Sequence, residues 1–193
     1  MSLNVLLLGL QGSGKGTQAR RIAEEYGLAN VGTGDMLRTA IASGTELGLR
    51  VKPIYDRGEL VPDELMIGLI EARLREEDAV DGFVLDGFPR TLAQADALDA
   101  MLAENDRSLS VVFELQIPHA VAIERLLTRA VDEGRTDDTP EAIERRIARY
   151  HEETAPLIQH YRARGILVGI HADRTVNQVF AEIQAALEQA AVR

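Results

Sequence analysis

Residues 3–17 read LNVLLLGLQGSGKGT, an apolar run that passes directly into a glycine-rich segment containing a lysine. The segment from Gly9 to Lys15 fits the pattern G-x-x-x-x-G-K. In such a loop the backbone N–H groups turn inward around a phosphate, the following helix adds partial positive charge, and the lysine reaches the outer phosphates. We therefore predict a strand, a phosphate-binding loop and a helix. The residues expected to contact a bound nucleotide are Gly12, Ser13, Gly14, Lys15, Gly16 and Thr17.

The same loop also contains a second, competing motif. Residues 14–19 spell G-x-G-x-x-A, and Asp35 follows about twenty residues later, as a dinucleotide-binding fold would require. In that motif the first glycine directly follows the strand, whereas Gly14 lies five residues beyond Gly9. The longer loop that results can encircle a terminal phosphate, so a nucleoside triphosphate is favoured over NAD as the ligand. Because Gly16 occupies the place of the usual hydroxyl, which follows at Thr17, we expect no direct Mg²⁺ ligation by that hydroxyl.

Short apolar runs alternate with segments of helical periodicity along the rest of the chain. This alternation is typical of βαβ units and predicts a three-layer α/β fold with five parallel strands flanked by helices. The expected strands are Leu3–Leu8, Ala29–Val31, Gly82–Leu85, Leu109–Ile117 and Ile166–Ile170. The expected helical core positions include Ala19, Ile22, Ala23 and Tyr26, then Ile123, Leu126, Leu127 and Ala130, then Val176, Val179, Phe180, Ile183 and Leu187.

Two segments interrupt this alternation. Glycines and a proline break residues 32–61 into short helices, which predicts an inserted helical lobe. Residues 131–138 form a polar loop, after which Thr139 and Pro140 predict a helix start that runs toward Pro156. The expected core therefore comprises residues 1–31, 62–130 and 139–193.

Composition limits the functions that the chain can have. The 193 residues include 31 acidic and 21 basic side chains, for a net charge of −10, and all but Lys15 and Lys52 of the basic residues are arginine. Nucleic-acid and membrane-surface binders need a broad basic face, so neither partner is expected and any anion site must be local. The absence of cysteine excludes disulfides, thiol catalysis and thiolate zinc sites. With no signal segment or apolar run of membrane length, we expect a soluble cytoplasmic protein.

A carboxylate and an arginine follow the third expected strand. Asp86 ends an apolar run, as does the aspartate that orients Mg²⁺ or its waters in many phosphate-loop proteins. Parallel strands would bring Gly9 and Asp86 to the same sheet edge. Arg90, fixed beside Pro89, would suit a bidentate grip on phosphate. The alternative for Asp86 is a turn-initiating residue before Gly87.

Two further arginine pairs lie on expected helices. Arg125 and Arg129 are four residues apart and opposite an apolar stripe, so they face either solvent or a cleft. Arg146 lies at the border of its helix's apolar stripe and is expected to reach inward, whereas Arg145 points away. The four histidines show no metal-ligand spacing.

Taken together, these motifs resemble those of the adenylate kinase family over nearly the whole chain. The family's loop, Gly-x-Pro-Gly-x-Gly-Lys-Gly-Thr, is matched from Gly9 to Thr17 with Gln11 in place of proline. Residues 33–38, TGDMLR, resemble its monophosphate-lobe motif. Residues 86–90, DGFPR, together with Gln94, resemble its signature segment.

The resemblance implies roles for individual residues. Arg38 and Arg90 would bind the AMP phosphate, and Arg125 would stack on the ATP adenine, with Arg174 near the same base. Asp86, with Asp35 as a helper, would organise Mg²⁺ through water and phosphate without direct ligation. The remaining AMP-site residues would be Thr33, Leu60, Val61, Gly87 and Gln94, and the residues acting on the transferring phosphates would be Lys15, Arg129, Arg135 and Arg146.

The resemblance also implies a short lid at residues 131–138, because only five residues separate Arg129 from Arg135. Asp137 and Asp138 match the acidic pair at the end of that lid, and a chain without cysteine would hold no structural zinc there. Residues 32–61 would be the monophosphate-binding lobe.

The implied reaction is Mg²⁺-dependent, reversible transfer from ATP to AMP that gives two ADP. Since no feature of the sequence suggests an obligate interface, we expect a monomer. Relatives that phosphorylate UMP or CMP share most of these motifs, but Thr33 and Thr91 favour AMP. A phosphate-loop switch that binds ATP without transferring phosphate is the alternative from another class. It would leave Arg38 and Arg90 unexplained.

Overall fold

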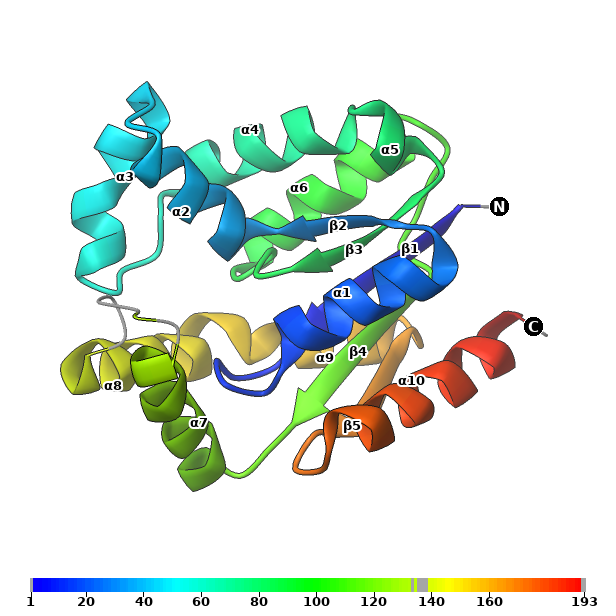
Figure 1. The fold of residues 1–193 in the computed structure, drawn as a ribbon. Helices are drawn as coiled ribbons and strands as arrows, with labels where there is room; N and C mark the ends of the chain where they lie inside the picture. The colour runs from blue at the N-terminus through cyan, green and yellow to red at the C-terminus, as the bar shows by residue number, and fades with distance from the viewer. Residues whose placement is uncertain (1, 133, 135–138, 192–193) are drawn as a thin grey trace.

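The computed structural model describes residues 2–132, 134 and 139–191. Within them, five parallel strands form one sheet in the order β2-β3-β1-β4-β5, which confirms the predicted α/β fold (Figure 1). The strands are β1 (Leu3–Leu8), β2 (Ala29–Gly32), β3 (Gly82–Asp86), β4 (Val111–Gln116) and β5 (Leu167–His171). The observed ends lie within two residues of the predicted ones. The fourth strand is the most shortened; before its first residue, the Ser110 N–H donates a hydrogen bond of 2.9 Å to the carbonyl of Asn4 in β1.

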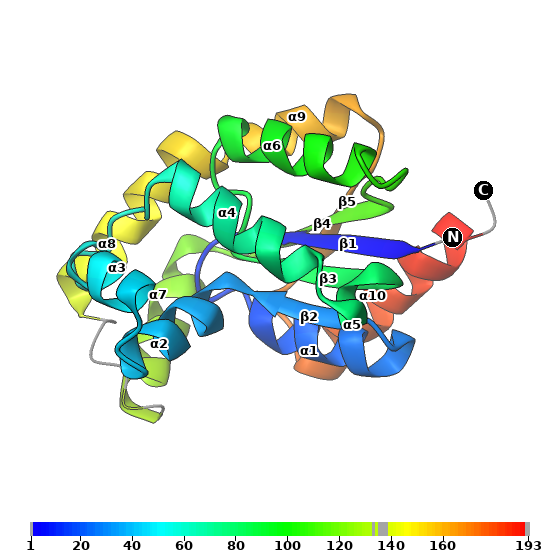
Figure 2. The same cartoon turned by 90° about the horizontal axis from the view of Figure 1, so that it is seen from above.

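Helices cover both faces of the sheet (Figure 2). Leu6 and Leu8 of β1 pack in one core cluster with residues of α4, α6 and α9, while Val5 and Leu7 pack in another with residues of α1 and α10. Strands buried on both faces explain the continuous apolar runs in the sequence. The helices are α1 (Lys15–Tyr26), α2 (Thr33–Ala42), α3 (Glu46–Asp56), α4 (Asp63–Leu74), α5 (Glu77–Val80), α6 (Leu92–Ala103), α7 (His119–Asp132), α8 (Pro140–Arg149), α9 (Pro156–Ala163) and α10 (Val176–Ala191).

The helix start predicted at Thr139 is confirmed. The Thr139 hydroxyl accepts a hydrogen bond of 3.2 Å from the backbone N–H of Ala142, and Pro140 occupies the first turn of α8. The predicted helix toward Pro156 changes form on the way. It passes through a π-helical turn, η1 (Tyr150–Thr154), and α9 then begins at Pro156.

Two predicted core positions are wrong. Leu127 of α7 is 42% exposed and Val176 of α10 is 47% exposed. The reason in α7 is that the helix buries only a narrow stripe, Ala122 and Leu126, against a small cluster with Ile143 of α8. Val176 is the first residue of α10 and lines the cleft described below instead of packing on the sheet. Among the described residues, no helix is long and apolar enough to cross a membrane.

Candidate functional site

A cleft of about 990 Å³ opens where the carboxyl ends of the central strands meet the surrounding helices. The β1–β3 register pairs Leu7 with Asp86, so the phosphate loop and Asp86 share this edge, as the sequence predicts. Residues of α2, α7 and α8 also line the cleft. A ligand in it would therefore contact the loop, the turn after β3 and the helices on either side.

The phosphate loop has the backbone that its glycines predict. Gly12 has φ +83°, and a Cβ atom there would lie 2.6 Å from the carbonyl oxygen of Ala122 in α7. A side chain at this position would therefore push the loop away from α7. The Lys15 ammonium donates hydrogen bonds to the carbonyl oxygens of Gly9 at 2.7 Å and Leu10 at 2.8 Å. The lysine is thus held over its own loop.

Lys15 and Asp86 form the electrostatic centre of the cleft. Burial lowers the pKa of the Lys15 ammonium to about 8, an effect that the negative charge of Asp86 opposes and the positive charges of Arg90 and Arg129 strengthen. Burial raises the pKa of the Asp86 carboxyl, and Lys15 and Arg90 oppose that shift. Each group thus favours the charged form of the other, next to a loop built to receive phosphate.

Arg90 is fixed by the turn that follows β3. Its Nε donates a hydrogen bond of 2.8 Å to the carbonyl oxygen of Gly87, and the Phe88–Pro89 peptide bond between them is cis. Gly87 has φ +84°, and a Cβ atom on it would lie 2.3 Å from Oγ1 of Thr33. The turn therefore requires glycine, and it presents the Arg90 guanidinium to the cleft.

Arg38, in α2, also lines the cleft. Its Nη1 donates a hydrogen bond of 2.8 Å to the hydroxyl of Tyr55, and its Nη2 bonds Oδ1 of Asp35. The Tyr55 ring also faces α8, because the guanidinium carbon of Arg146 lies 5.6 Å from the ring centroid. Sequence reasoning missed Tyr55. No local pattern marks it, since its role comes from the packing of α3 against the cleft.

Three residues expected around the AMP base do not line the cleft. Thr33 is fully buried, and its hydroxyl donates a hydrogen bond of 3.3 Å to the carbonyl oxygen of Asp86. Val61 is buried in the core cluster that contains Leu6. Gln94 is 2% exposed, with its amide bonded to Arg90 and Asp63. The other four, Arg38, Leu60, Gly87 and Arg90, do line the cleft.

The opposite end of the cleft is formed by α7 and the turn between β5 and α10. Arg125 and Arg129 of α7 both line it, which resolves the alternative of a purely solvated face. Nη1 of Arg125 donates a hydrogen bond of 3.1 Å to the carbonyl oxygen of Ala172, at the end of β5. Arg125 therefore links α7 to the turn that contains Arg174, another lining residue.

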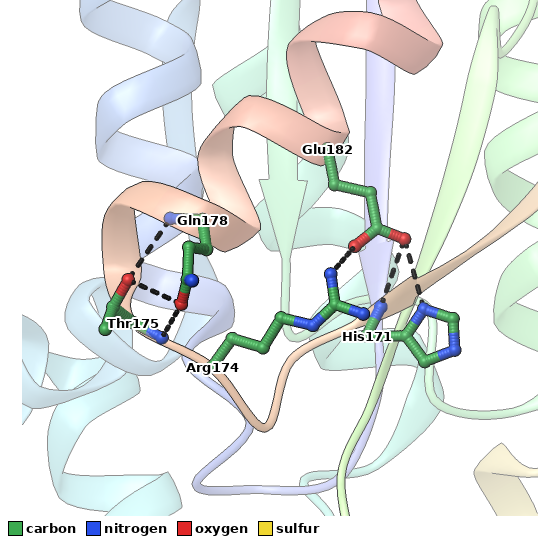
Figure 3. A network of polar contacts seen from close by, with 5 residues as sticks. All are labelled: His171, Arg174, Thr175, Gln178 and Glu182. Carbon is green, nitrogen blue, oxygen red and sulfur yellow. Dashed lines mark hydrogen bonds and ion pairs between the residues drawn. The ribbon is translucent and has the colours of Figure 1, made fainter.

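The Glu182 carboxylate of α10 contacts two residues next to the same turn, His171 and Arg174 (Figure 3). Oε2 of Glu182 accepts a hydrogen bond of 3.3 Å from Nη1 of Arg174, and its Oε1 lies 3.2 Å from Nδ1 of His171. The Thr175 hydroxyl donates to Oε1 of Gln178 at 2.9 Å at the start of α10. These contacts fix the backbone between β5 and α10, and they keep the Arg174 guanidinium bonded to α10.

The two neighbouring arginines of α8 take different positions. Arg146 lines the cleft, whereas Nε of Arg145 donates a hydrogen bond of 2.9 Å to the backbone carbonyl of Arg57. The predicted inward direction of Arg146 is thus confirmed. Arg135, Asp137 and Asp138 lie outside the described residues.

The cleft gathers positive charge in a protein whose net charge is −10. Two of the lining arginines, Arg20 and Arg149, were not predicted from the sequence. Both sit on amphipathic helices where a solvated arginine gives the same pattern. The lining cations within the described residues are Lys15, Arg20, Arg38, Arg90, Arg125, Arg129, Arg146, Arg149 and Arg174.

The carboxylates of the cleft suit a cation that arrives with phosphate. Asp35 and Asp86 both line it, and a Cβ atom on Gly16 would lie 3.5 Å from Oδ2 of Asp86, so this carboxylate faces the start of α1. The described residues contain no cluster of three or more His, Cys, Asp or Glu side chains that could hold a metal alone. Mg²⁺ usually keeps several waters and takes one or two carboxylates plus substrate phosphates, and this donor set fits that mode.

Comparison with known proteins agrees with this architecture. Residues 7–166 match the family model described as adenylate kinase. An adenylate kinase of Caulobacter vibrioides (strain NA1000 / CB15N) is 49% identical over 189 residues, covering 98% of this chain and 99% of the relative. That of Phenylobacterium zucineum (strain HLK1) is 48% identical, covering 98% and 100%. That of Stenotrophomonas maltophilia (strain R551-3) is 42% identical, covering 96% and 100%.

Proposed function

The chain belongs to the adenylate kinase family, and from this premise we propose how its cleft performs the family's reaction. That reaction is reversible phosphoryl transfer between ATP and AMP, giving two ADP. The observation that carries the assignment of sites is that one cleft is lined both by the glycine-rich loop with Lys15 and by two further arginines, Arg38 and Arg90.

In our proposal the ATP phosphates occupy the loop from Gly12 to Thr17, beneath the Lys15 ammonium. The ATP base lies between Arg125 and the turn that contains Arg174, which two different helices hold in place. The AMP phosphate is bound by Arg38 and Arg90. An arginine fork suits a phosphate group because it donates two parallel hydrogen bonds.

The chemical step is an in-line displacement. An AMP phosphate oxygen forms a bond to the γ-phosphorus of ATP, and the bond from that phosphorus to the β–γ bridging oxygen breaks, releasing ADP. The attacking oxygen is already anionic near neutral pH, so no general base is needed. Catalysis comes from positioning and from neutralisation of the transferring group's charge by Lys15, Arg129, Arg135 and Arg146.

The carboxylates have a supporting role in this proposal. Asp86, with Asp35 as a helper, would position Mg²⁺ through its water molecules. When bound with ATP, Mg²⁺ would supply positive charge that offsets the negative charge of the phosphates. The Lys15 charge, which stabilises the ionised form of Asp86, keeps that carboxylate available.

We also propose a division of the chain that serves this chemistry. Residues 32–61 form the AMP-binding lobe and residues 131–138 a short lid. Residues 1–31, 62–130 and 139–193 form the core. Closure of the lobe and lid over both nucleotides would exclude water, which otherwise competes as the phosphoryl acceptor. We further expect a cytoplasmic monomer, and light scattering during size-exclusion chromatography should give the single-chain mass of 21.2 kDa.

The experiment that tests the proposal is ADP formation from MgATP with AMP, CMP, UMP and GMP supplied separately. We expect rapid ADP formation with AMP and much slower formation with the other three. Preference for CMP or UMP would instead assign a pyrimidine monophosphate kinase. Equal rates with and without every monophosphate would contradict phosphoryl transfer altogether and favour the ATP-binding switch.

A further inference from the structure

A half-buried aspartate outside the cleft lining joins α4 and α6 next to the turn that contains Arg90. Asp63, the first residue of α4, accepts a hydrogen bond of 2.7 Å at Oδ1 from Nε2 of Gln94. Its Oδ2 accepts a bond of 3.0 Å from the hydroxyl of Thr91. The Thr91 oxygen in turn accepts a bond of 3.2 Å from the backbone N–H of Gln94 and caps α6. Asp63 therefore contacts both the cap of α6 and the amide of Gln94.

The orientation of the Gln94 amide is fixed at both ends. Its Oε1 accepts a hydrogen bond of 2.7 Å from the backbone N–H of Arg90, while its Nε2 donates to the Asp63 carboxylate. Rotating the amide by half a turn would place an N–H group against the Arg90 N–H and a carbonyl oxygen against the carboxylate. Because Gln94 is 2% exposed, neither mismatch could be relieved by solvent.

This fixed orientation determines what the amide can offer to a base. A glutamine amide has two N–H donors and two acceptor lone pairs. One donor faces Asp63 and one lone pair faces Arg90. The second donor and the second lone pair remain for a base, and the fixed amide determines which of them lies on which side. Adenine presents its amino group beside a ring-nitrogen acceptor, and an amide can pair with both. Hypoxanthine, the base of IMP, carries a carbonyl oxygen in place of that amino group and so reverses the order.

We propose that Asp63 is a specificity-positioning residue for the acceptor base. It acts through Gln94: by holding the amide in one orientation, it favours adenine over bases with a carbonyl at the same position. This inference rests on the proposed function, together with the AMP-site role for Gln94 that the resemblance to the family implies. It also gives Thr91 a physical role, since its hydroxyl holds the second carboxylate oxygen of Asp63.

The test compares AMP with IMP as acceptors at saturating MgATP, because the two differ only at the base edge. Asp63→Ala removes the carboxylate, and Asp63→Asn keeps its volume but replaces an acceptor-only group with one that can also donate, so the Gln94 amide is then held only from the Arg90 side. We expect both variants to raise KM for AMP and to lower the AMP-to-IMP ratio of kcat/KM by about tenfold, as the loss of one buried hydrogen-bonded partner allows. KM for ATP should stay within about twofold, since the side-chain partners of Asp63 are Thr91 and Gln94, neither of which we assign to ATP. KM does not depend on the folded fraction, so partial unfolding of Asp63→Ala would not mimic this result.

Two further variants make the test specific. In a Gln94→Ala background, adding Asp63→Ala should change the AMP-to-IMP ratio no further, because Asp63 acts only through that amide. Asp78→Ala is the matched control. Asp78 is an exposed aspartate that accepts a hydrogen bond of 2.7 Å from Arg73 away from the cleft, and its loss should leave the ratio unchanged.

The outcomes separate this inference from the proposed function. If Gln94→Ala loses the preference for AMP while both Asp63 variants keep it, the role of Asp63 is overturned and the proposed reaction stands. A lower KM for AMP in the Asp63 variants would also overturn it, because Asp63 would then compete with the base for Gln94. Failure of the unmodified protein to form ADP from AMP would contradict the proposed function itself.

Discussion

The hydroxyl of Tyr55 accepts a hydrogen bond of 2.8 Å from Nη1 of Arg38, which joins α3 to the arginine that we assign to the AMP phosphate. The same ring lies 5.6 Å from the guanidinium carbon of Arg146 in α8. Tyr55 thus contacts one arginine proposed to bind the acceptor phosphate and another proposed to act on the transferring group. Tyr55 therefore positions Arg38 in the cleft.

Tyr55→Phe should therefore weaken AMP binding selectively. The substitution removes the hydroxyl and keeps the ring, so Arg38 loses one fixed partner. We expect KM for AMP to rise about three- to tenfold, the range for one lost ordinary hydrogen bond, with KM for ATP within about twofold. Steady-state kinetics with each substrate varied would measure this. Tyr26→Phe, at the end of α1, is the control. An unchanged KM for AMP would remove Tyr55 from the site.

Arg145 and Arg146 offer a comparison between adjacent residues of the same type. Arg146→Ala should lower kcat about a hundredfold or more, because it removes a charge aimed at the transferring phosphoryl group. Arg145→Ala loses a hydrogen bond to the backbone carbonyl of Arg57 outside the cleft lining and should change kcat by less than about threefold. Equal losses in the two variants would contradict the assignment of Arg146.

The lowered pKa of Lys15 predicts a pH dependence of ATP binding. The ammonium is charged below pH about 8, and bound phosphate favours that charged form, so affinity should fall as pH rises above about 8. Calorimetry of MgATP binding in buffers of different ionisation enthalpy should show uptake of about one proton at pH 9 and much less at pH 7.

Two variants check that Lys15 is the group responsible. Lys15→Met should abolish the proton uptake, whereas Lys52→Ala should retain it, because Lys52 pairs with Asp56 in α3. The lowered pKa of Lys15 also makes the free energy of unfolding depend on pH. Between pH about 8 and 10.5 the unfolded chain holds a proton that the folded protein has lost, so Lys15 makes the free energy of unfolding rise with pH. Proton uptake that survives Lys15→Met would assign the titration to another residue.

Glu182→Gln tests whether the turn between β5 and α10 must be held in place. The variant weakens the contacts to Arg174 and His171, so the ATP base should meet a less ordered turn. We expect KM for ATP to rise about three- to fivefold while KM for AMP is unchanged. Glu188→Gln, an exposed residue further along α10, is the control. A rise in KM for AMP alone would place the turn outside the ATP site.

The sequence alone predicts the sheet and the phosphate loop well. Strands buried on both faces give continuous apolar runs, and the loop's glycines and lysine have few structural substitutes. The π-helical turn at residues 150–154 was not predicted, because its residues fit an α-helix equally well. Leu127 shows a second limit of prediction from sequence, which concerns burial. Helical spacing identifies an apolar side chain, but only the packing partner decides whether it is buried.

The cleft was predicted less completely than the fold. Lys15, Arg90 and Arg146 could be named because motif or helix position directs them inward. Tyr55 and Asp63 could not, since each acts through partners brought together by tertiary packing. Asp63 and Gln94 are 31 residues apart, and no local pattern indicates that a carboxylate and an amide will meet.

The most direct measurement of the central claim follows the phosphoryl group itself. The protein is incubated with Mg²⁺, AMP and ATP labelled at the γ-phosphate, and the early products are separated. Our account predicts that the label appears in ADP made from AMP, with little inorganic phosphate, and that Arg90→Ala greatly reduces this transfer. Label released as inorganic phosphate at a rate independent of AMP would contradict it.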